Sequence, residues 1–245
     1  MKPAFLFIFA WLAFAVRGED FEWSGAITAT GTAPTARYAH TSVFYGDYMV
    51  VFGGNDGGAN KNDLHKLDLS TNTWSGAITA TGTAPTARFA HTSVVYGDYM
   101  VVFGGRDGAY KNDLHKLTLS TNAWSGAITA TGTAPTARRT HTSVVHGNYM
   151  IVFGGYDGSK LNDLDKLTLS TNAWSGAITA TGTKPTARLA HTSVVYGDYM
   201  VVFGGEDGGV KKNDLHKLQL PSLACQIGHY CTDLSAPQNA IACPL

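Results

Sequence analysis

Four near-identical segments of about fifty residues make up most of this chain. The string WSGAITATGT begins at Trp23 and recurs at Trp74, Trp124 and Trp174, at intervals of 50 or 51 residues. Each copy continues through HTSV, YM[VI]VFGG, an Asp-Gly pair and NDL[HD]KL. Self-similarity at such a period is the signature of solenoids, propellers and arrays, in which each unit buries its apolar face only against its neighbours. A repeat architecture is therefore predicted.

Each copy contains four short strand-like runs separated by turn signals. In the first complete copy they cover residues 40–45, 48–52 and 64–69, and the fourth starts at Trp74. We name them strands A, B, C and D. The runs are rich in β-branched and aromatic residues, and no window has apolar residues at helical spacing with caps. Four short antiparallel strands per unit, stacked radially, form a propeller blade, so the predicted class is all-β.

Several motifs of the copies resemble one known family. RxxHTSV, MVVFGG, NDLHKL and TNxW together resemble the kelch motif over residues 21 to about 220. The resemblance implies a kelch-type β-propeller with four blades of four antiparallel strands, acting as a non-catalytic binding module. Kelch propellers usually have more than four blades. Pairing of a first D strand at residues 21–28 with the last C strand at 215–220 would close the ring at four; a fragment of a longer array is the alternative.

The two ends of the chain differ in composition from the repeats. Residues 1–18 combine Lys2 with an apolar stretch over 4–16, which is typical of a signal peptide and too short to span a membrane. We therefore expect a secreted or extracellular protein whose mature chain has no membrane span. Residues 19–220 form the propeller, and residues 221–245 form a tail that resembles the cysteine-rich modules of ephrin-receptor-like regions. Its disulfide candidates are Cys225, Cys231 and Cys243.

Charge and motif content argue against several classes of function. The chain has 18 basic and 18 acidic residues and no basic run, so a nucleic-acid partner is not expected. Neither GxSxG nor HExxH occurs, and the Ser, His and Asp residues recur in every copy, whereas catalysis requires an asymmetric site. We predict no enzymatic activity, no cofactor and no metal. A zinc site made by the tail cysteines with His229 is the weaker alternative to disulfides.

Three polar positions recur once per copy, and each has a structural and a functional interpretation. We interpret the histidine before TSV as hydrogen-bonded within its blade rather than as a metal ligand. We interpret the Asp of each Asp-Gly pair as a turn residue rather than as a calcium ligand. We expect the arginine after Pro-Thr-Ala to pair with a repeated Asp, such as Asp63 or Asp113, rather than to form an anion site. The positions are His40, His91, His141 and His191; Asp56, Asp107, Asp157 and Asp207; and Arg37, Arg88, Arg138 and Arg188.

The copies differ mainly at two positions, which directly follow the repeated arginine and the double glycine. The first set is Tyr38, Phe89, Arg139 and Leu189, and the second is Asn55, Arg106, Tyr156 and Glu206. Because consecutive strands alternate in direction, the D–A and B–C connections share one face. Exposed aromatic and arginine side chains on loops are typical binding anchors. We predict that this face binds a protein; a glycan ligand, or a structural or adhesive spacer role, are the alternatives.

Overall fold

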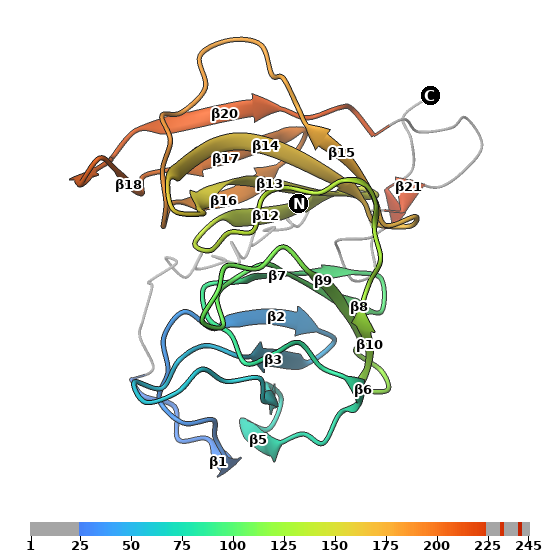
Figure 1. The fold of residues 1–245 in the computed structure, drawn as a ribbon. Helices are drawn as coiled ribbons and strands as arrows, with labels where there is room; N and C mark the ends of the chain where they lie inside the picture. Colours follow the sequence, from blue (N-terminus) through green and yellow to red (C-terminus); the bar gives the residue numbers. More distant parts are fainter. Residues whose placement is uncertain (1–24, 224–230, 233–239, 242–245) are drawn as a thin grey trace, which may run out of the picture.

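The structure is a computed structural model that describes residues 25–223 and the backbone of 231–232 and 240–241. All of its regular elements are strands, and no helix occurs in these ranges. Four sheets follow one another in chain order from the blue blade at the bottom of Figure 1 to the orange blade at the top. The predicted all-β propeller of four blades is confirmed. The predicted signal peptide lies outside the described residues, as do the side chains of the three cysteines.

Each blade is an antiparallel meander, and the strands of the first blade start or end within a residue of the predicted runs, whereas β13 and β14 of the third blade extend several residues further. In the first blade, strands A to D are β2 (Thr41–Tyr45), β3 (Tyr48–Phe52), β4 (Leu64–Asp68) and β5 (Thr73–Ala77). The second blade has β7 (Thr92–Tyr96), β8 (Tyr99–Phe103), β9 (Leu114–Thr118) and β10 (Ala123–Ala127). The third has β12 (Thr142–His146), β13 (Tyr149–Tyr156), β14 (Lys160–Thr168) and β15 (Ala173–Ala177). The fourth has β16 (Thr192–Tyr196), β17 (Tyr199–Phe203) and β20 (Leu215–Gln219).

Short additional strands complete this inventory. The loop between β17 and β20 carries a hairpin of β18 (Glu206–Asp207) and β19 (Val210–Lys211), and the tail contains β21 (Cys231–Thr232) paired with β22 (Ala240–Ile241). Three blades also gain a fifth, outermost strand that the sequence did not predict. β1 (Thr30–Thr32), β6 (Thr81–Thr83) and β11 (Thr131–Thr133) pair in parallel with β5, β10 and β15.

The fifth strand was missed because its Thr-Gly-Thr sequence has no apolar side chain and no face to bury. It forms where the chain, after crossing from one blade, runs along strand D of the next. Residues 181–183 repeat the sequence but form no strand, because the described part of blade four has no strand D to pair with. Tertiary context, rather than propensity, therefore decides whether this segment is a strand.

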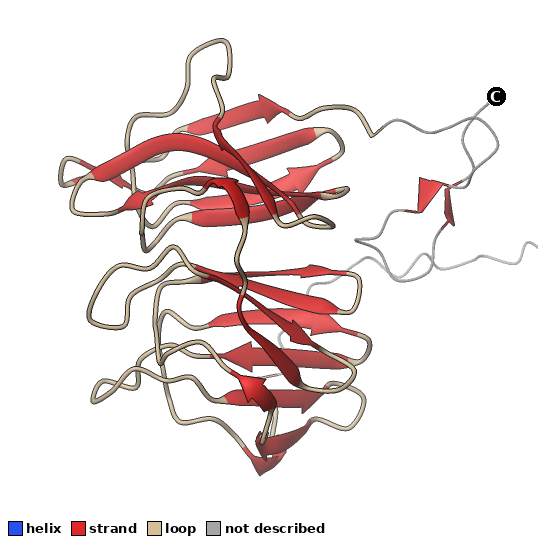
Figure 2. Cartoon of the chain, turned by 45° about the vertical axis from the view of Figure 1, so that its right-hand side comes forward, coloured by secondary structure: helices blue, strands red, loops and turns tan. Residues whose placement is uncertain are grey.

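The core lies between consecutive blades, whose sheets follow one another in Figure 2. Between blades one and two, Phe52 and Leu64 of the first blade are buried against Met100 and Trp124 of the second, and the Phe52 and Trp124 rings lie 5.0 Å apart. Phe103 and Trp174 repeat that contact, also at 5.0 Å, between blades two and three. One face of each sheet thus packs on the next sheet, which is why the strands are apolar on both sides.

The double glycine lets neighbouring blades approach closely. Gly53 and Gly54 have φ angles of 65° and 95°, a region that favours glycine. A Cβ on Gly53 would lie 2.9 Å from the His91 ring of the next blade, and one on Gly54 would lie 2.8 Å from the Cβ of His40. Both the backbone conformation and the space therefore require glycine.

The two terminal blades remain apart. The innermost strands contact each other in order, β2 with β7, β7 with β12 and β12 with β16, and within residues 25–223 no comparable contact joins β16 to β2. The predicted closing strand at residues 21–28 lies outside the described residues as far as position 24, and residues 25–28 are not in a strand. The four blades thus form an open arc over the described residues, with an uncovered face at each end.

Candidate functional site

The two variable positions of each copy are paired with each other on one face. In the first blade the backbone N–H groups of Tyr38 and Asn55 each donate to the other residue's carbonyl, at 2.9 and 3.0 Å. The D–A and B–C loops are therefore held side by side in every blade, as strand alternation implies. The equivalent pairs are Phe89 with Arg106, Arg139 with Tyr156, and Leu189 with Glu206.

Side chains from three blades contact each other across this face. The rings of Tyr38 and Phe89 meet edge to face at 6.4 Å. The guanidinium of Arg139 lies over the Phe89 ring at 6.0 Å and over the Tyr156 ring at 5.5 Å. Phe89, Arg139 and Tyr156 are half-buried, and Tyr38 is exposed. The variable residues of neighbouring blades thus build one continuous surface.

Tyr110 belongs to the same surface and was not predicted. Its ring meets Tyr156 at 5.8 Å and receives the guanidinium of Arg106 at 5.6 Å. The signal was present, because this position also varies between copies. The residues at this position in the four copies are Asn60, Tyr110, Lys160 and Lys211. Each is paired through the backbone with the residue after the double glycine of its own blade. We call Tyr38, Phe89, Arg106, Tyr110, Arg139 and Tyr156 the cross-blade cluster.

The charges of the cluster are not neutralised within the described residues. Arg139 and Arg106 form no ion pair there, and the buried Nε of Arg139 has no hydrogen-bond partner. By contrast, Glu206 of blade four is paired with Lys160 at 3.3 Å. Asn55 is bonded to Asn60, and Leu189 is half-buried. Six of the variable side chains therefore form a cationic aromatic surface, and blade four contributes least to it.

The backbone beneath the cluster is rigidly linked from blade to blade. Ala39, Ala90 and Thr140 each have φ of 53–54°, which is unusual for residues other than glycine. The N–H of Ala90 donates to the Ala39 carbonyl at 2.8 Å, and the N–H of Thr140 donates to the Ala90 carbonyl at 2.9 Å. This chain of bonds fixes the spacing of the variable side chains, and so preorganises the surface.

The repeated arginines are structural, as predicted. Arg88 is completely buried and donates two hydrogen bonds to the Asp113 carboxylate, at 2.6 and 2.8 Å, and one to the Gly104 carbonyl at 2.9 Å. The same bidentate pair recurs in the other blades. The pairs are Arg37 with Asp63, Arg138 with Asp163, and Arg188 with Asp214.

Three of the four repeated histidines bridge adjacent blades. His91 Nε2 lies 2.9 Å from the Thr41 hydroxyl of the preceding blade, and His141 and His191 make the equivalent contact at the same distance. The expected bond lay inside each blade, so the observed partner differs from the predicted one. Burial, followed by the nearby Arg88 charge, lowers the pKa of His91 to about 3. These rings are neutral at physiological pH.

The Asp-Gly turns also match the structural interpretation. The Asp56 carboxylate accepts hydrogen bonds from the N–H groups of Gly58 and Ala59, at 3.1 and 2.8 Å, and is paired with Lys61. Asp107 and Asp157 accept equivalent turn bonds. Across residues 25–223, no group of three or more His, Cys, Asp or Glu side chains is arranged to hold a metal ion.

Asp165 breaks the pattern of the repeat. Three blades have a histidine here, and its Nε2 lies 3.0–3.1 Å from the aspartate two residues earlier. In blade three the buried Asp165 instead faces Asp163, lies 3.9 Å from Arg138, and has an oxygen without a hydrogen-bond partner. Burial and the Asp163 charge raise the pKa of Asp165 to about 6. The ionised Asp165 carboxylate therefore destabilises the fold.

Replacing Asp165 with asparagine is expected to stabilise the chain at pH 7 by about 1–3 kcal/mol. Because the folded-state pKa of about 6 exceeds the ordinary value of 3.8, the destabilisation is complete above pH 6. It shrinks as the pH falls from 6 and is lost below 3.8, where the folded and the unfolded state both bind the proton. Urea unfolding of wild type and Asp165→Asn at pH 7 and pH 4 measures this. An advantage of the variant that is equally large at both pH values would contradict the assignment.

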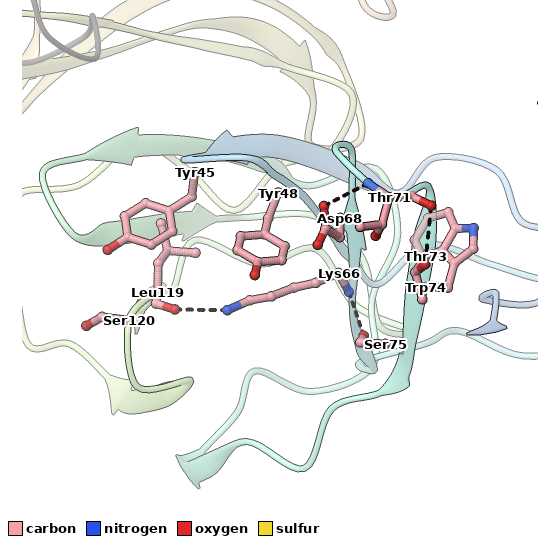
Figure 3. A pocket seen from close by; sticks show the side chains of 10 residues that line it. All are labelled: Tyr45, Tyr48, Lys66, Asp68, Thr71, Thr73, Trp74, Ser75, Leu119 and Ser120. Carbon is pink, nitrogen blue, oxygen red and sulfur yellow. Dashed lines mark hydrogen bonds between the residues drawn. The ribbon is translucent and has the colours of Figure 1, made fainter. Parts of the chain in front are cut away.

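A groove lies on the opposite face, between the outer parts of blades one and two (Figure 3). It has a volume of about 580 Å³ and is lined by Tyr48, Trp74 and several hydroxyl groups. Lys66 crosses it, donates to the Leu119 carbonyl of blade two at 3.0 Å, and lies 5.8 Å from the centre of the Tyr48 ring. Burial lowers the pKa of Lys66. A similar groove of about 510 Å³ follows between blades two and three.

Comparison with known proteins identifies the repeat. The model of the KLHDC2/KLHL20/DRC7 Kelch-repeats domain family matches this chain in two overlapping segments, residues 12–155 and 91–239. Human Kelch domain-containing protein 3 is 42% identical over 79 residues, which are 31% of this chain and 20% of that protein. Human Host cell factor 2 is 43% identical over 89 residues, 34% of this chain and 11% of that protein.

A third relative places similar repeats in a different setting. A probable serine/threonine-protein kinase of Dictyostelium discoideum is 39% identical over 85 residues, which are 34% of this chain and 6% of the kinase. The matched part of this chain thus spans a fifth or less of the length of these curated relatives.

None of the segments that the structure describes forms a helix long and apolar enough to cross a membrane. Kelch propellers generally mediate protein–protein interaction and are typically non-enzymatic. With its period, its double glycines and the match over most of its length, the chain belongs to the Kelch-repeats domain family.

Proposed function

We propose that this chain is an extracellular binding module whose cross-blade cluster holds a protein segment. The observation that carries the proposal is the position of Arg139. Its guanidinium lies between the Phe89 and Tyr156 rings and has no acidic partner among the described residues. An unpaired arginine held between aromatic rings is preorganised to receive a carboxylate, because little side-chain entropy is lost on binding.

The chemistry of the cluster favours an acidic peptide segment with an apolar side chain. Arg106 and Arg139 supply two cations, and Tyr38 supplies an aromatic ring that is 58% exposed. Arginine and tyrosine are enriched among residues that dominate binding energy. The resulting surface pairs charge recognition with apolar contact, as peptide-binding faces of rigid scaffolds do.

Replacing Arg106, Arg139 and Tyr156 together with alanine is expected to abolish peptide binding. Each true anchor contributes about 2 kcal/mol or more, which corresponds to roughly 30-fold in affinity. The immobilised chain would be used to select a displayed library of random peptides, and the affinities of the selected peptides would be measured for both proteins. We expect enrichment of Asp and Glu with wild type and binding at least 100-fold weaker to the triple variant, by the same arithmetic.

The control changes the opposite face conservatively. Asp47, Asp98 and Asp198 become asparagine, which blade three already carries as Asn148 at this turn. Asn148 accepts from the Ser170 N–H at 3.0 Å, much as Asp98 accepts from that of Ser120 at 3.1 Å, so the fold should be unaffected. Loss of binding in this control, with binding kept in the triple variant, would show that the proposed binding face is wrong and that the opposite face binds the peptide.

The extracellular setting rests on the signal-peptide pattern of residues 1–18 and on the cysteines of the tail. Disulfides among Cys225, Cys231 and Cys243 would stabilise a segment too small for a core of its own. Expression in secreting cells tests this part of the proposal. Recovery from the medium with an N-terminus at Glu19 supports it, and retention of the intact chain inside the cells contradicts it.

Glycan binding is the second candidate, and the grooves of the opposite face favour it. Each presents an aromatic ring beside hydroxyl groups, a combination that suits stacking against a sugar ring. A glycan array probed with the wild type and with a Tyr48→Ala variant distinguishes the two. Signal that depends on Tyr48, together with no enriched peptide, would favour the glycan; neither signal would favour a structural or adhesive spacer.

A further inference from the structure

The two ends of the arc are apolar faces that no part of the described chain covers. On the outer side of blade four, Val194, Phe203 and Leu215 are 59%, 50% and 64% exposed. The residues equivalent to them in the first three blades are at most 9% exposed, because the next blade covers them. On the outer side of blade one, Phe44 is 67% and Leu69 is 41% exposed, whereas Leu119 and Leu169, the equivalents of Leu69, are fully buried.

We call these surfaces the tail face and the head face. The tail face comprises Val194, Tyr196, Phe203, Leu215 and Lys217 of blade four; the head face comprises Phe44, Met49, Leu67, Leu69 and Trp74 of blade one. Terminal repeats of stable arrays normally present a polar outer surface that caps the core. Within residues 25–223 neither end of the arc has such a cap, so both faces have the character of interfaces rather than of free surfaces.

Each face has the composition of one half of the interfaces inside the chain. At the first internal interface, Val43, Phe52 and Leu64 pack on Met100, Leu117, Leu119 and Trp124. The tail face repeats the first half as Val194, Phe203 and Leu215. The head face repeats the second half as Met49, Leu67, Leu69 and Trp74.

The polar groups of the two faces are complementary in the same way. Inside the chain, Lys66 and Lys116 donate to the Leu119 and Leu169 carbonyls of the next blade, each at 3.0 Å. Lys217 is the equivalent donor on the tail face. It forms no such bond among the described residues and lies over its own Tyr199 ring at 4.4 Å. The carbonyl of Leu69 is the equivalent acceptor on the head face.

A histidine and a threonine repeat this relation. Thr41, Thr92 and Thr142 each lie 2.9 Å from the repeated histidine of the next blade. No described blade follows Thr192 of the tail face, and its hydroxyl turns to the Phe203 carbonyl of its own sheet at 3.5 Å. No described blade precedes His40 of blade one, which is exposed, whereas His91, His141 and His191 are buried.

We propose that the tail face binds the head face of a second copy of this chain. The two ends lie at opposite ends of the arc in Figures 1 and 2, so one copy does not bring them together. The first two internal interfaces join surfaces of the same composition. The contact is heterologous, joining different surfaces of the two copies, and it therefore produces a head-to-tail assembly.

Sedimentation velocity over a wide range of protein concentration tests the proposal. Wild type is expected to form dimers or larger species as the concentration rises. Leu215→Asp blocks the tail face and Leu69→Asp blocks the head face, and each variant alone should remain a monomer. Thr131→Asp on the exposed outer edge of blade three is the matched control, and it should assemble like wild type.

Mixing the two blocked variants makes the test specific for a heterologous contact. Leu215→Asp keeps an intact head face and Leu69→Asp an intact tail face, so an equimolar mixture should form a heterodimer that does not grow further. Circular dichroism melts confirm that both variants are folded. Wild type that stays monomeric at every concentration overturns the proposal, as does a mixture of folded variants that forms no heterodimer.

Discussion

Replacing Trp124 with alanine is expected to lower the free energy of unfolding by about 3–5 kcal/mol. The Trp124 side chain is 5% exposed and packs on Phe52 of the preceding blade with the ring centres 5.0 Å apart. Its removal leaves a cavity between two rigid sheets, which collapse poorly around it. Urea unfolding followed by far-UV circular dichroism, which reports the β-sheet backbone, measures the loss.

Trp74 provides the matched control. It occupies the equivalent position in blade one, where no described blade precedes it, and it is half-buried. Trp74→Ala should therefore cost about 1–2 kcal/mol. The comparison is made in the Leu215→Asp background, where association cannot cover the head face. Equal losses at the two positions would show that packing between blades does not stabilise Trp124.

Replacing Arg88 with alanine is expected to lower the free energy of unfolding by about 3–5 kcal/mol at pH 7. The guanidinium is fully buried and ties the D–A loop to the B–C loop through Asp113 and the Gly104 carbonyl. Without it, the Gly104 carbonyl loses this donor, and the Asp113 carboxylate keeps only its contact with His115. Arg88→Lys should recover part of the loss, because it keeps the charge but not the bidentate geometry.

The pH dependence of this variant distinguishes an ion pair from simple packing. Burial alone would raise the pKa of Asp113, but hydrogen bonds from Arg88 and His115 hold it well below its ordinary value of 3.8. Stability from this pair is therefore present above pH 3.8 and is lost as the pH falls below it. The difference between wild type and Arg88→Ala should shrink in that acidic range. A difference that is independent of pH would assign the effect to lost volume.

The two proposed contacts use separate parts of the arc. The cross-blade cluster lies on the D–A/B–C face of blades one to three, whereas head-to-tail association covers the outer sides of blades one and four. Assembly would therefore place several cross-blade clusters in one particle. A partner with repeated acidic segments would gain affinity from that multivalency without any new kind of contact.

Much of the fold follows from the sequence, because each copy encodes its blade locally. Alternating apolar residues, Gly-Asp turns and double glycines predict strands A, B and C of the first blade to within a residue, whereas the extension of β13 and β14 in the third blade was not predicted. The variable residues could be placed on one face because strand direction alternates. The pairing of Arg88 with Asp113 could also be anticipated, since a charge buried in every copy needs a partner in every copy.

Contacts between blades were decided only by the tertiary structure. The copies are nearly identical, so the sequence does not say which Thr meets which His, and the bond from Thr41 to His91 was assigned to the wrong sheet. Stacking of Arg139 between Phe89 and Tyr156, and the part played by Tyr110, depend on the spacing of adjacent blades. The short strand at Thr30–Thr32 exists only because strand D of the next blade lies beside it. Local sequence determines a blade, whereas the distance and angle between blades, which come from packing, determine the surface that they share.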